Sequence, residues 1–442
     1  MSHQSLFRDT IFALSSGSPP TGVAVIRISG PHVVLVLREM AGGLPSARKA
    51  ELRKLVDEDG ALLDRALTLY FPGPTSFTGE DCAELHVHGG KAVVSAVLET
   101  LGRKSGLRGA EAGEFTRRAF VNGKLDLTSA EGLADLISAE TDAQRRLALV
   151  NAEGGQRELY EGWRNQLLHA RAMIEAELDF ADESDVPGSV SETVWVGISS
   201  LQKEIINHID GYRTAEIVRD GFKVVLVGAP NAGKSSLMNA LARRDVAIVT
   251  EVAGTTRDLV EVALDLDGLK VMVTDTAGLR ESSDIVEKIG IERARQAARQ
   301  ADLVVELIDS SAPIGELEYD FPTDSRILVA TKADLTGLVD WQFDHAISVV
   351  NGEGLAELVG DITRRASAAA TGGLGIIPSR LRQIELLRSC HQHLHGAMQN
   401  GSGLELQAEE LRLAGDMLGR ITGAIDVEDL LGVIFSEFCI GK

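Results

Sequence analysis

The sequence predicts a multidomain α/β protein with an α+β domain first, an all-α domain after it, and a domain with a mostly parallel sheet inserted into the all-α domain. Three observations predict this organisation. An apolar run at residues 222–227, a glycine-containing loop and an Ala/Leu-rich segment follow one another in the order strand, loop and helix. Apolar residues recur at helical spacing on both sides of that region, and strand-like alternation marks the first 124 residues.

Residues 1–124 combine strand-like and short helical segments. Residues 22–29 alternate like a strand, Leu35 lies in a short helical stretch, and residues 57–60 (Asp-Glu-Asp-Gly) predict a turn between two more strands. From residue 125 to about 219 the pattern becomes helical. Apolar side chains fall on one helical face at Leu133, Leu136, Ile137, Leu147 and Val150, and later at Leu167, Ile174 and Leu178.

Helices return after the central domain, which spans residues 220–370. A Gly-rich joint at residues 371–375 leads into residues 371–442, whose apolar positions step by three and four. Neither helical block has a complete core alone, so we expect residues 125–219 and 371–442 to pack together around an inserted central domain. The positions that carry this pattern are Leu411, Ala414, Leu418, Ile421, Ile425, Leu430, Ile434 and Phe438.

The loop after the apolar run is a P-loop. It reads Gly228-Ala229-Pro230-Asn231-Ala232-Gly233-Lys234-Ser235. Its glycines let backbone amides turn toward phosphates, Lys234 reaches the β and γ phosphates, and the Ser235 hydroxyl ligates magnesium. The helix that begins near Lys234 directs its positive end at the same phosphates. The alternative interpretation is a Gly-rich surface turn.

Three further motifs follow in the order and spacing of a Ras-like GTPase domain, and they resemble those of small GTPases of the translation-factor type. Gly254-Thr255-Thr256-Arg257-Asp258 offers Thr256 as a second magnesium ligand. Asp275-Thr276-Ala277-Gly278 ends an apolar strand and supplies an acidic residue for the magnesium shell and a Gly amide for the γ phosphate. Thr331-Lys332-Ala333-Asp334 ends another strand, and Asp334 is expected to pair with guanine N1 and N2 and so select GTP over ATP.

Two positions depart from the usual GTPase pattern. Thr331 stands where many GTPases have Asn, so the side-chain amide contact to guanine is missing and we expect this to affect nucleotide affinity. Leu279 stands where Ras-like proteins have the Gln that orients the attacking water, so another group must position that water.

Asn231 and Glu287 are the candidates for that catalytic role. The Asn231 carbonyl could coordinate a monovalent cation against the phosphates and supply the positive charge that other systems take from an arginine finger. Glu287 could hold the water indirectly. The alternatives are a loop residue chosen for turn geometry at Asn231 and a solvated helix charge at Glu287.

Composition limits the remaining possibilities. The 442 residues are 44% hydrophobic and 25% charged, as in soluble globular proteins with several domains. No apolar run approaches the length of a membrane span and no signal-peptide pattern is present, so we expect a cytoplasmic protein without membrane contact. The formal charge of −21 argues against broad nucleic-acid binding by this chain alone.

Metal and disulfide signals are weak. Cys82, Cys390 and Cys439 are widely spaced and lack CxxC or Cys/His clustering, which supports neither a disulfide framework nor a zinc site. His391, His393 and His395 are the rival metal signal, with a solvated helix end as the preferred interpretation.

The chain resembles the MnmE (TrmE) family of tRNA-modification GTPases over essentially its full length. The terminal Cys-x-Gly-Lys is the most specific part, because such a chain end has no general structural reason to occur. Besides the GTPase motifs, the resemblance rests on Arg27-Ile28-Ser29-Gly30, Phe77-Thr78-Gly79-Glu80-Asp81, His88-Gly89-Gly90, Gly113-Glu114-Phe115-Thr116, Lys124-Leu125-Asp126-Leu127 and Phe438-Cys439-Ile440-Gly441-Lys442.

The resemblance implies a homodimer formed through an N-terminal domain that binds a tetrahydrofolate one-carbon donor, the 5,10-methylene or 5-formyl derivative. It implies a flavin-containing partner, MnmG, with which the protein forms a heterotetramer. The complex is expected to act on C5 of the wobble uridine of certain tRNAs and to add an aminomethyl or carboxymethylaminomethyl group there. It also implies that the GTPase domains meet face to face in a potassium-dependent way and that GTP hydrolysis drives the modification.

The same resemblance implies a set of functional residues. Folate contacts fall on Arg27, Glu84, Lys124 and Lys442. The expected potassium ligands are Asn231, Thr250, Val252 and Thr255, and the expected magnesium ligands are Ser235 and Thr256. Glu287 is expected to act in hydrolysis. Cys439 is a candidate nucleophile, with a small buried apolar residue as the alternative. Together with the motifs, the resemblance assigns GTP contacts to Asn231, Ala232, Gly233, Lys234, Ser235, Ser236, Thr250, Glu251, Val252, Ala253, Gly254, Thr255, Thr256, Asp275, Thr276, Ala277, Gly278, Thr331, Lys332, Ala333 and Asp334.

Two other functions remain open on sequence grounds. One is a regulatory switch, such as a ribosome-assembly GTPase, which would bind no folate and leave uridines unaltered. The other is a folate-dependent one-carbon transferase with a regulatory GTPase attached, acting without tRNA.

Overall fold

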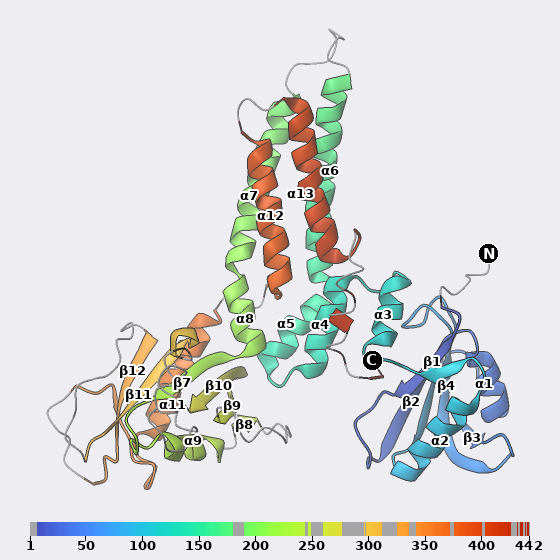
Figure 1. The fold of residues 1–442 in the computed structure, drawn as a ribbon, viewed down its shortest axis with the longest axis horizontal. Coiled ribbons are helices and arrows are strands. Elements are labelled where there is room, and N and C mark those ends of the chain that lie inside the picture. The colour runs from blue at the N-terminus through green and yellow to red at the C-terminus, as the bar shows by residue number, and fades with distance from the viewer. Residues whose placement is uncertain are drawn as a thin grey trace, which may run out of the picture. The chain divides into compact units, whose positions relative to one another are not determined.

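The computed structural model describes most of the chain (Figure 1). The chain falls into two compact units. The first unit comprises Met1–Ala134, Asn151–Arg171 and Leu411–Lys442, and the second comprises Asp135–Val150 and Ala172–Glu410. The described residues are 7–179, 190–243, 246–248, 260–275, 296, 298–311, 325–335, 342–371, 375–399, 403–425, 431, 434–435, 438 and 440–441.

A six-stranded sheet forms the centre of the first unit, in the order β3-β4-β5-β2-β1-β6. All neighbours are antiparallel except β1 and β6, which are parallel. This sheet with its flanking helices agrees with the α+β pattern expected for this part of the chain. The strands are β1 (Thr10–Leu14), β2 (Val23–Ser29), β3 (Glu51–Val56), β4 (Leu62–Phe71), β5 (Cys82–His88) and β6 (Leu107–Gly109).

The two faces of this sheet have different chemistry because alternate residues of each strand point to opposite faces. One face is apolar, and α1 (Val33–Met40) and α2 (Lys91–Arg103) pack on it to form a core that includes Ile26, Ile28 and Leu85. The other face carries Arg27 of β2 directly opposite Glu84 of β5. The strand alternation therefore places this polar pair away from the main core.

Helical segments complete the first unit. Helix α3 (Glu114–Val121) contributes Phe115, which packs with Ile11 and Ala13 of β1. Helix α4 (Leu127–Ser138) begins in this unit, and its Ala130 packs with Phe435 and Phe438 near the chain end. Parts of α6 (Gly155–Asp179) and α13 (Leu404–Thr422) also belong to this unit.

The second unit contains a seven-stranded sheet in the order β13-β12-β11-β7-β10-β9-β8. The pairings from β13 to β10 are parallel, whereas β9 is antiparallel to both β10 and β8. This mostly parallel sheet confirms the predicted fold class. The strands are β7 (Phe222–Val227), β8 (Ala247–Ile248), β9 (Val260–Leu266), β10 (Leu269–Asp275), β11 (Leu303–Asp309), β12 (Arg326–Thr331) and β13 (His345–Ala346).

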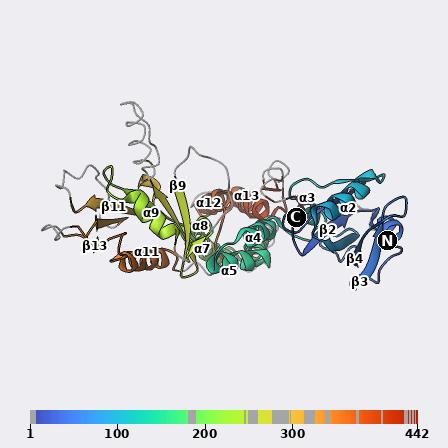
Figure 2. The ribbon, with the colours of Figure 1, turned by 90° about the horizontal axis from the view of Figure 1, so that it is seen from below.

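Helices α9 (Lys234–Ala242) and α11 (Leu355–Ala369) lie beside this sheet (Figure 2). Leu237 of α9 and Leu358 of α11 belong to one core cluster with Val224, Val273 and Val305 of the strands, so both helices cover the same sheet face. The opposite face carries a separate small cluster that includes Val227 and Ala298.

Four further helices belong wholly or largely to the second unit. They are α5 (Asp142–Ala152), α7 (Val190–Asp210), α8 (Tyr212–Asp220) and α12 (Leu381–Ala397). Helix α7 precedes the seven-stranded sheet in sequence and α12 follows it, and the two helices pack against each other. Helical segments on both sides of the central domain thus meet within one unit.

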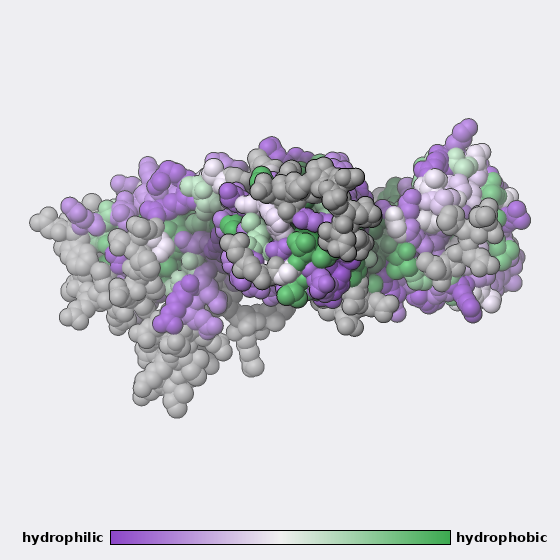
Figure 3. Space-filling model, turned by 90° about the horizontal axis from the view of Figure 1, so that it is seen from above, coloured by the Kyte–Doolittle hydropathy of each residue, from purple (hydrophilic) through white to green (hydrophobic). Residues whose placement is uncertain are grey.

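The described surface is mostly hydrophilic on the face seen in Figure 3. Exposed apolar side chains such as Leu168 and Val196 occur along the helices, and single exposed apolar residues are normal on protein surfaces. No helix among the described residues is long and apolar enough to cross a bilayer.

Candidate nucleotide site and a second polar site

The P-loop has the backbone geometry that its glycines predict. It connects the end of β7 at Val227 to the start of α9 at Lys234. Gly233 caps the helix with φ 96°, a left-handed conformation that favours glycine. Gly228 has φ 144°, and a Cβ there would lie 2.3 Å from the carbonyl oxygen of Leu307. Both glycines are therefore required by the backbone.

Lys234 and Ser235 lie at the base of this loop. The Lys234 Nζ donates hydrogen bonds to the carbonyl oxygens of Gly228 at 2.6 Å and Ala229 at 2.9 Å. Burial lowers the pKa of Lys234, and the negative charge of Asp275 opposes that shift. The Ser235 hydroxyl donates to a carboxylate oxygen of Asp275 at 2.8 Å. A hydroxyl and a carboxylate in contact are oxygen donors of the kind that magnesium prefers, so these residues fit the predicted ion.

Thr331 has a structural role that the sequence comparison with ordinary GTPases did not reveal. Its hydroxyl donates a hydrogen bond to the carbonyl oxygen of Ala232 at 2.7 Å, and the residue is buried. Thr331 therefore ties the turn after β12 to the P-loop, although it lacks the amide that usually contacts guanine.

The rest of that turn is also ordered by contacts. Lys332 has φ 56°, and its ammonium pairs with the Asp309 carboxylate at the end of β11. The backbone N–H of Ala333 donates to the carbonyl oxygen of Ile347 at 3.1 Å. Asp334, which is predicted to read the base, follows and is exposed.

Many of the predicted nucleotide and catalytic residues lie outside the described residues, and their roles remain predictions. The same holds for the two chain-end candidates. They are Thr250, Glu251, Val252, Ala253, Gly254, Thr255, Thr256, Thr276, Ala277, Gly278, Leu279, Glu287, Cys439 and Lys442.

In the first unit, the structure brings Arg27 and Glu84 into direct contact. Arg27 donates from Nε at 3.2 Å and from a terminal guanidinium nitrogen at 3.0 Å to one Glu84 oxygen. The other Glu84 oxygen lies 3.1 Å from Nε2 of His86. Burial acts to raise the pKa of Glu84, but the hydrogen bond with His86 and the charge and hydrogen bond of Arg27 outweigh it, so the pKa is lowered. Glu84 is thus an ionised acceptor at neutral pH.

Two aromatic rings lie near the Arg27 guanidinium. The Arg27 guanidinium carbon lies 5.6 Å from the ring centre of Phe77 and 5.8 Å from that of Phe115, which is within the range of cation–π attraction. Lys124 is exposed, and its side chain lies close to Gly79. Gly79 belongs to the same loop as Phe77. Sequence reasoning singled out neither His86 nor the two rings as members of this site.

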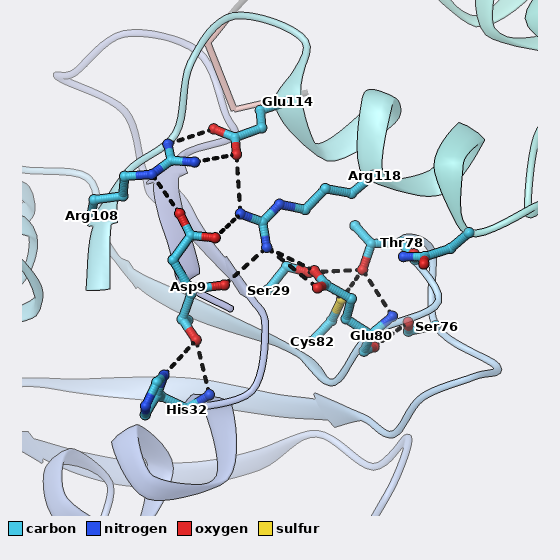
Figure 4. Close-up of polar contacts among 12 residues, drawn as sticks. Asp9, Ser29, His32, Ser76, Thr78, Glu80, Cys82, Arg108, Glu114 and Arg118 are labelled. Atoms are coloured by element: carbon cyan, nitrogen blue, oxygen red, sulfur yellow. Dashed lines mark hydrogen bonds and ion pairs between the residues drawn. The ribbon is translucent and has the colours of Figure 1, made fainter. Parts of the chain in front are cut away.

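An ion cluster around Arg118 includes Glu80 of the loop before β5 (Figure 4). The fully buried Arg118 pairs with Asp9 at 2.8 Å, with Glu80 at 3.1 Å and with Glu114 at 3.1 Å. Glu80 also accepts a hydrogen bond from the Ser29 hydroxyl at 2.8 Å. The cluster therefore links α3, the loop before β5 and the end of β2. Removing one member of a buried ion group leaves an uncompensated charge, so this part of the fold tolerates little change.

A contact in the second unit connects the seven-stranded sheet to helix α5. The Lys270 Nζ lies 2.6 Å from a carboxylate oxygen of Glu140, and the backbone N–H of Ala143 donates to the carbonyl oxygen of Gly268 at 3.0 Å. Lys270 and Gly268 lie at the turn end of the β9–β10 hairpin, and Asp275 ends β10 at its other end. One strand therefore spans from the helical contact to the nucleotide site.

Together these features define the class of the second unit. A P-loop between β7 and α9, an acidic residue of β10 bonded to the P-loop serine, and a Thr-Lys-Ala-Asp turn after β12 are the parts of a P-loop GTPase domain.

Comparison with known sequences identifies the family. The profile described as the GTP-binding protein TrmE N-terminus matches residues 10–124, and that of the MnmE helical domain matches residues 127–439. The tRNA modification GTPase MnmE of Mesorhizobium japonicum is 58% identical over 442 residues, covering 98% of this chain and 99% of that protein. Its counterpart in Chelativorans sp. is 57% identical over 446 residues, covering 100% of both. The chain belongs to the MnmE (TrmE) family of tRNA modification GTPases.

Proposed function

We propose that this GTPase takes part in modifying C5 of the wobble uridine in tRNA, using a tetrahydrofolate one-carbon unit and a flavoprotein partner. Full-length membership in the MnmE family supports a tRNA substrate. The observation that carries the folate part is the Arg27–Glu84 pair, in which an ionised, partly buried carboxylate contacts a cation that lies 5.6 Å and 5.8 Å from the centres of two aromatic rings.

The nucleotide side of the proposal follows from the P-loop geometry. Lys234 and the N-terminal amides of α9 would hold the phosphates, and Asp334 would read guanine. Ser235 and Thr256 would ligate magnesium, which supplies Lewis-acid stabilisation of phosphate charge. Potassium would be held by Asn231, Thr250, Val252 and Thr255, with Glu287 acting in hydrolysis.

The folate side follows from the polarity of the first unit. A pterin presents neighbouring N–H donors and acceptors, so an ionised Glu84 can accept hydrogen bonds from its donors. Arg27, Lys124 and Lys442 would meet carbonyl or anionic groups, because charge-assisted hydrogen bonds to such groups are strong. Cys439 remains a candidate nucleophile.

In the proposed assembly, each segment of the chain forms a domain with its own role. Residues 1–124 form the dimerisation and folate domain, residues 125–219 and 371–442 form the helical domain, and residues 220–370 form the inserted GTPase domain. A cytoplasmic homodimer would join MnmG in a heterotetramer. With a formal charge of −21 on this chain, we expect the partner to supply most of the basic surface for tRNA.

Calorimetry with 5-formyltetrahydrofolate tests the folate site. The Arg27→Gln variant should bind this folate at least tenfold more weakly. The substitution removes the ion-pair partner of Glu84 and a cation that would contact the ligand. Arg53→Gln is the matched control, since Arg53 forms a similar partly exposed pair with Glu51 on the edge strand β3. GTP turnover should be unchanged in both variants. Equal affinity in Arg27→Gln would remove Arg27 from the site, and no binding by the unaltered chain would exclude the folate function.

A further inference from the structure

Ile440 and Gly441 contact two segments next to the sheet of the first unit. Ile440 forms an isolated antiparallel bridge with Ala112. The hydroxyl of Ser15 donates a hydrogen bond to the carbonyl oxygen of Gly441 at 2.7 Å. Ser15 and Ala112 belong to different loops, so two independent contacts hold adjacent residues of the chain end.

Two glycines show how closely the backbones approach here. Gly441 has φ 98°, and a Cβ on it would lie 2.2 Å from the carbonyl oxygen of Leu14. A Cβ on Gly113 would lie 2.3 Å from the carbonyl oxygen of Phe435. Both distances are too short for any side chain, so the fit depends on glycine at each position.

Ser15 also lies close to the polar pair along the sheet. It directly follows β1, in which Ala13 is the register partner of Arg27. Its backbone N–H donates to the carbonyl oxygen of Val25 at 2.8 Å, which continues the pairing with β2 beyond the strand end. The chain end therefore contacts the strand pair that carries Arg27.

We infer that Ser15 is a positioning residue, whose hydroxyl holds the Gly441 carbonyl and so fixes residues 440–441 against the strand pair that carries Arg27. This inference rests on the proposed function for the chemistry of the site, but the anchoring itself can be measured without folate. A single neutral hydrogen bond makes a modest net contribution, so losing it should raise the undocked population of the chain end about fivefold.

Thiol labelling of Cys439 in the full-length protein measures that docking. The other two cysteines, Cys82 and Cys390, are buried and should react slowly. Ser15→Ala should label about fivefold faster than the unaltered chain, and Ser15→Thr, which keeps a hydroxyl, should restore the slow rate. Ser16→Ala is the matched control, because the neighbouring Ser16 hydroxyl accepts from the Val25 N–H at 3.0 Å instead of binding Gly441.

The second readout is affinity for 5-formyltetrahydrofolate, with GTP turnover as the reference. Ser15→Ala should weaken folate binding about fivefold and leave GTP turnover unchanged, whereas Ser16→Ala should change neither. Equal labelling of Ser15→Ala and the unaltered chain would overturn the inference. Faster labelling in a protein that binds no folate at all would support the anchor while contradicting the proposed folate function.

Discussion

Thr331 donates a hydrogen bond to the carbonyl oxygen of Ala232 at 2.7 Å, so the turn expected to read the base is tied directly to the P-loop. We expect Thr331→Val to weaken GTP binding about tenfold, because a buried carbonyl would lose its donor. Thr331→Ser keeps the hydroxyl and should bind within about twofold of the unaltered protein. Fluorescent-nucleotide titration measures both, and equal affinities in the Val and Ser variants would refute the role of the hydroxyl.

Potassium dependence tests the role proposed for Asn231. Asn231 has φ 66°, which glycine also adopts without strain, so Asn231→Gly removes the side-chain carbonyl while keeping the loop conformation. GTP turnover should be much faster in potassium than in sodium at equal ionic strength, and Asn231→Gly should abolish most of that difference. Slow turnover at the same rate in both salts would place the protein among ordinary switch GTPases.

The Lys270–Glu140 pair should stabilise the contact between the β9–β10 hairpin and helix α5. Its atoms approach to 2.6 Å, and both side chains are largely buried, with 20% and 25% exposure. Lys270→Glu places two like charges together and should speed amide hydrogen exchange in α5 about fivefold. Adding Glu140→Lys should restore protection, and failure of the double variant to recover would show that the pair does not hold the contact.

His208 should make the second unit less stable in acid. Burial lowers the pKa of this side chain to about 4, although a hydrogen bond with the Ile376 backbone acts to raise it. In the unfolded chain, the pKa of a histidine is about 6.5. The unfolded state therefore binds more protons between these values, and up to about 3 kcal/mol of stability is lost as the pH falls through that window.

Urea unfolding of the unaltered chain and of His208→Gln at pH 7.5 and pH 5 measures this effect. The variant should show the smaller loss of stability between the two pH values. An identical loss in both proteins would show that other groups account for the acid sensitivity.

Local sequence patterns predicted much of the fold and part of the candidate site. The P-loop was predictable because one octapeptide contains both the required glycines and the phosphate-binding lysine, and strand alternation explains why Arg27 and Ile28 face opposite sides of the sheet. The remaining features depend on tertiary contacts. Arg118 had only the helical spacing to Glu114 as a local signal, and its partners Asp9 and Glu80 are distant in sequence.

The same reason applies to two other contacts. Ser15 is separated from Gly441 by nearly the whole chain, and neither residue marks the other in the sequence. Thr331 departs from the usual motif, and its bond to Ala232 becomes visible only once the sheet brings the end of β12 close to the P-loop that follows β7. Local propensity carries no information about such pairings.

Mass spectrometry of tRNA nucleosides tests the central claim most directly. Cells that lack this protein should lose the C5 modification of wobble uridine, the unaltered chain should restore it, and the Arg27→Gln variant should restore it poorly although it hydrolyses GTP normally. Wobble uridines that are unchanged in cells without the protein would contradict the account and would favour a regulatory GTPase that acts elsewhere.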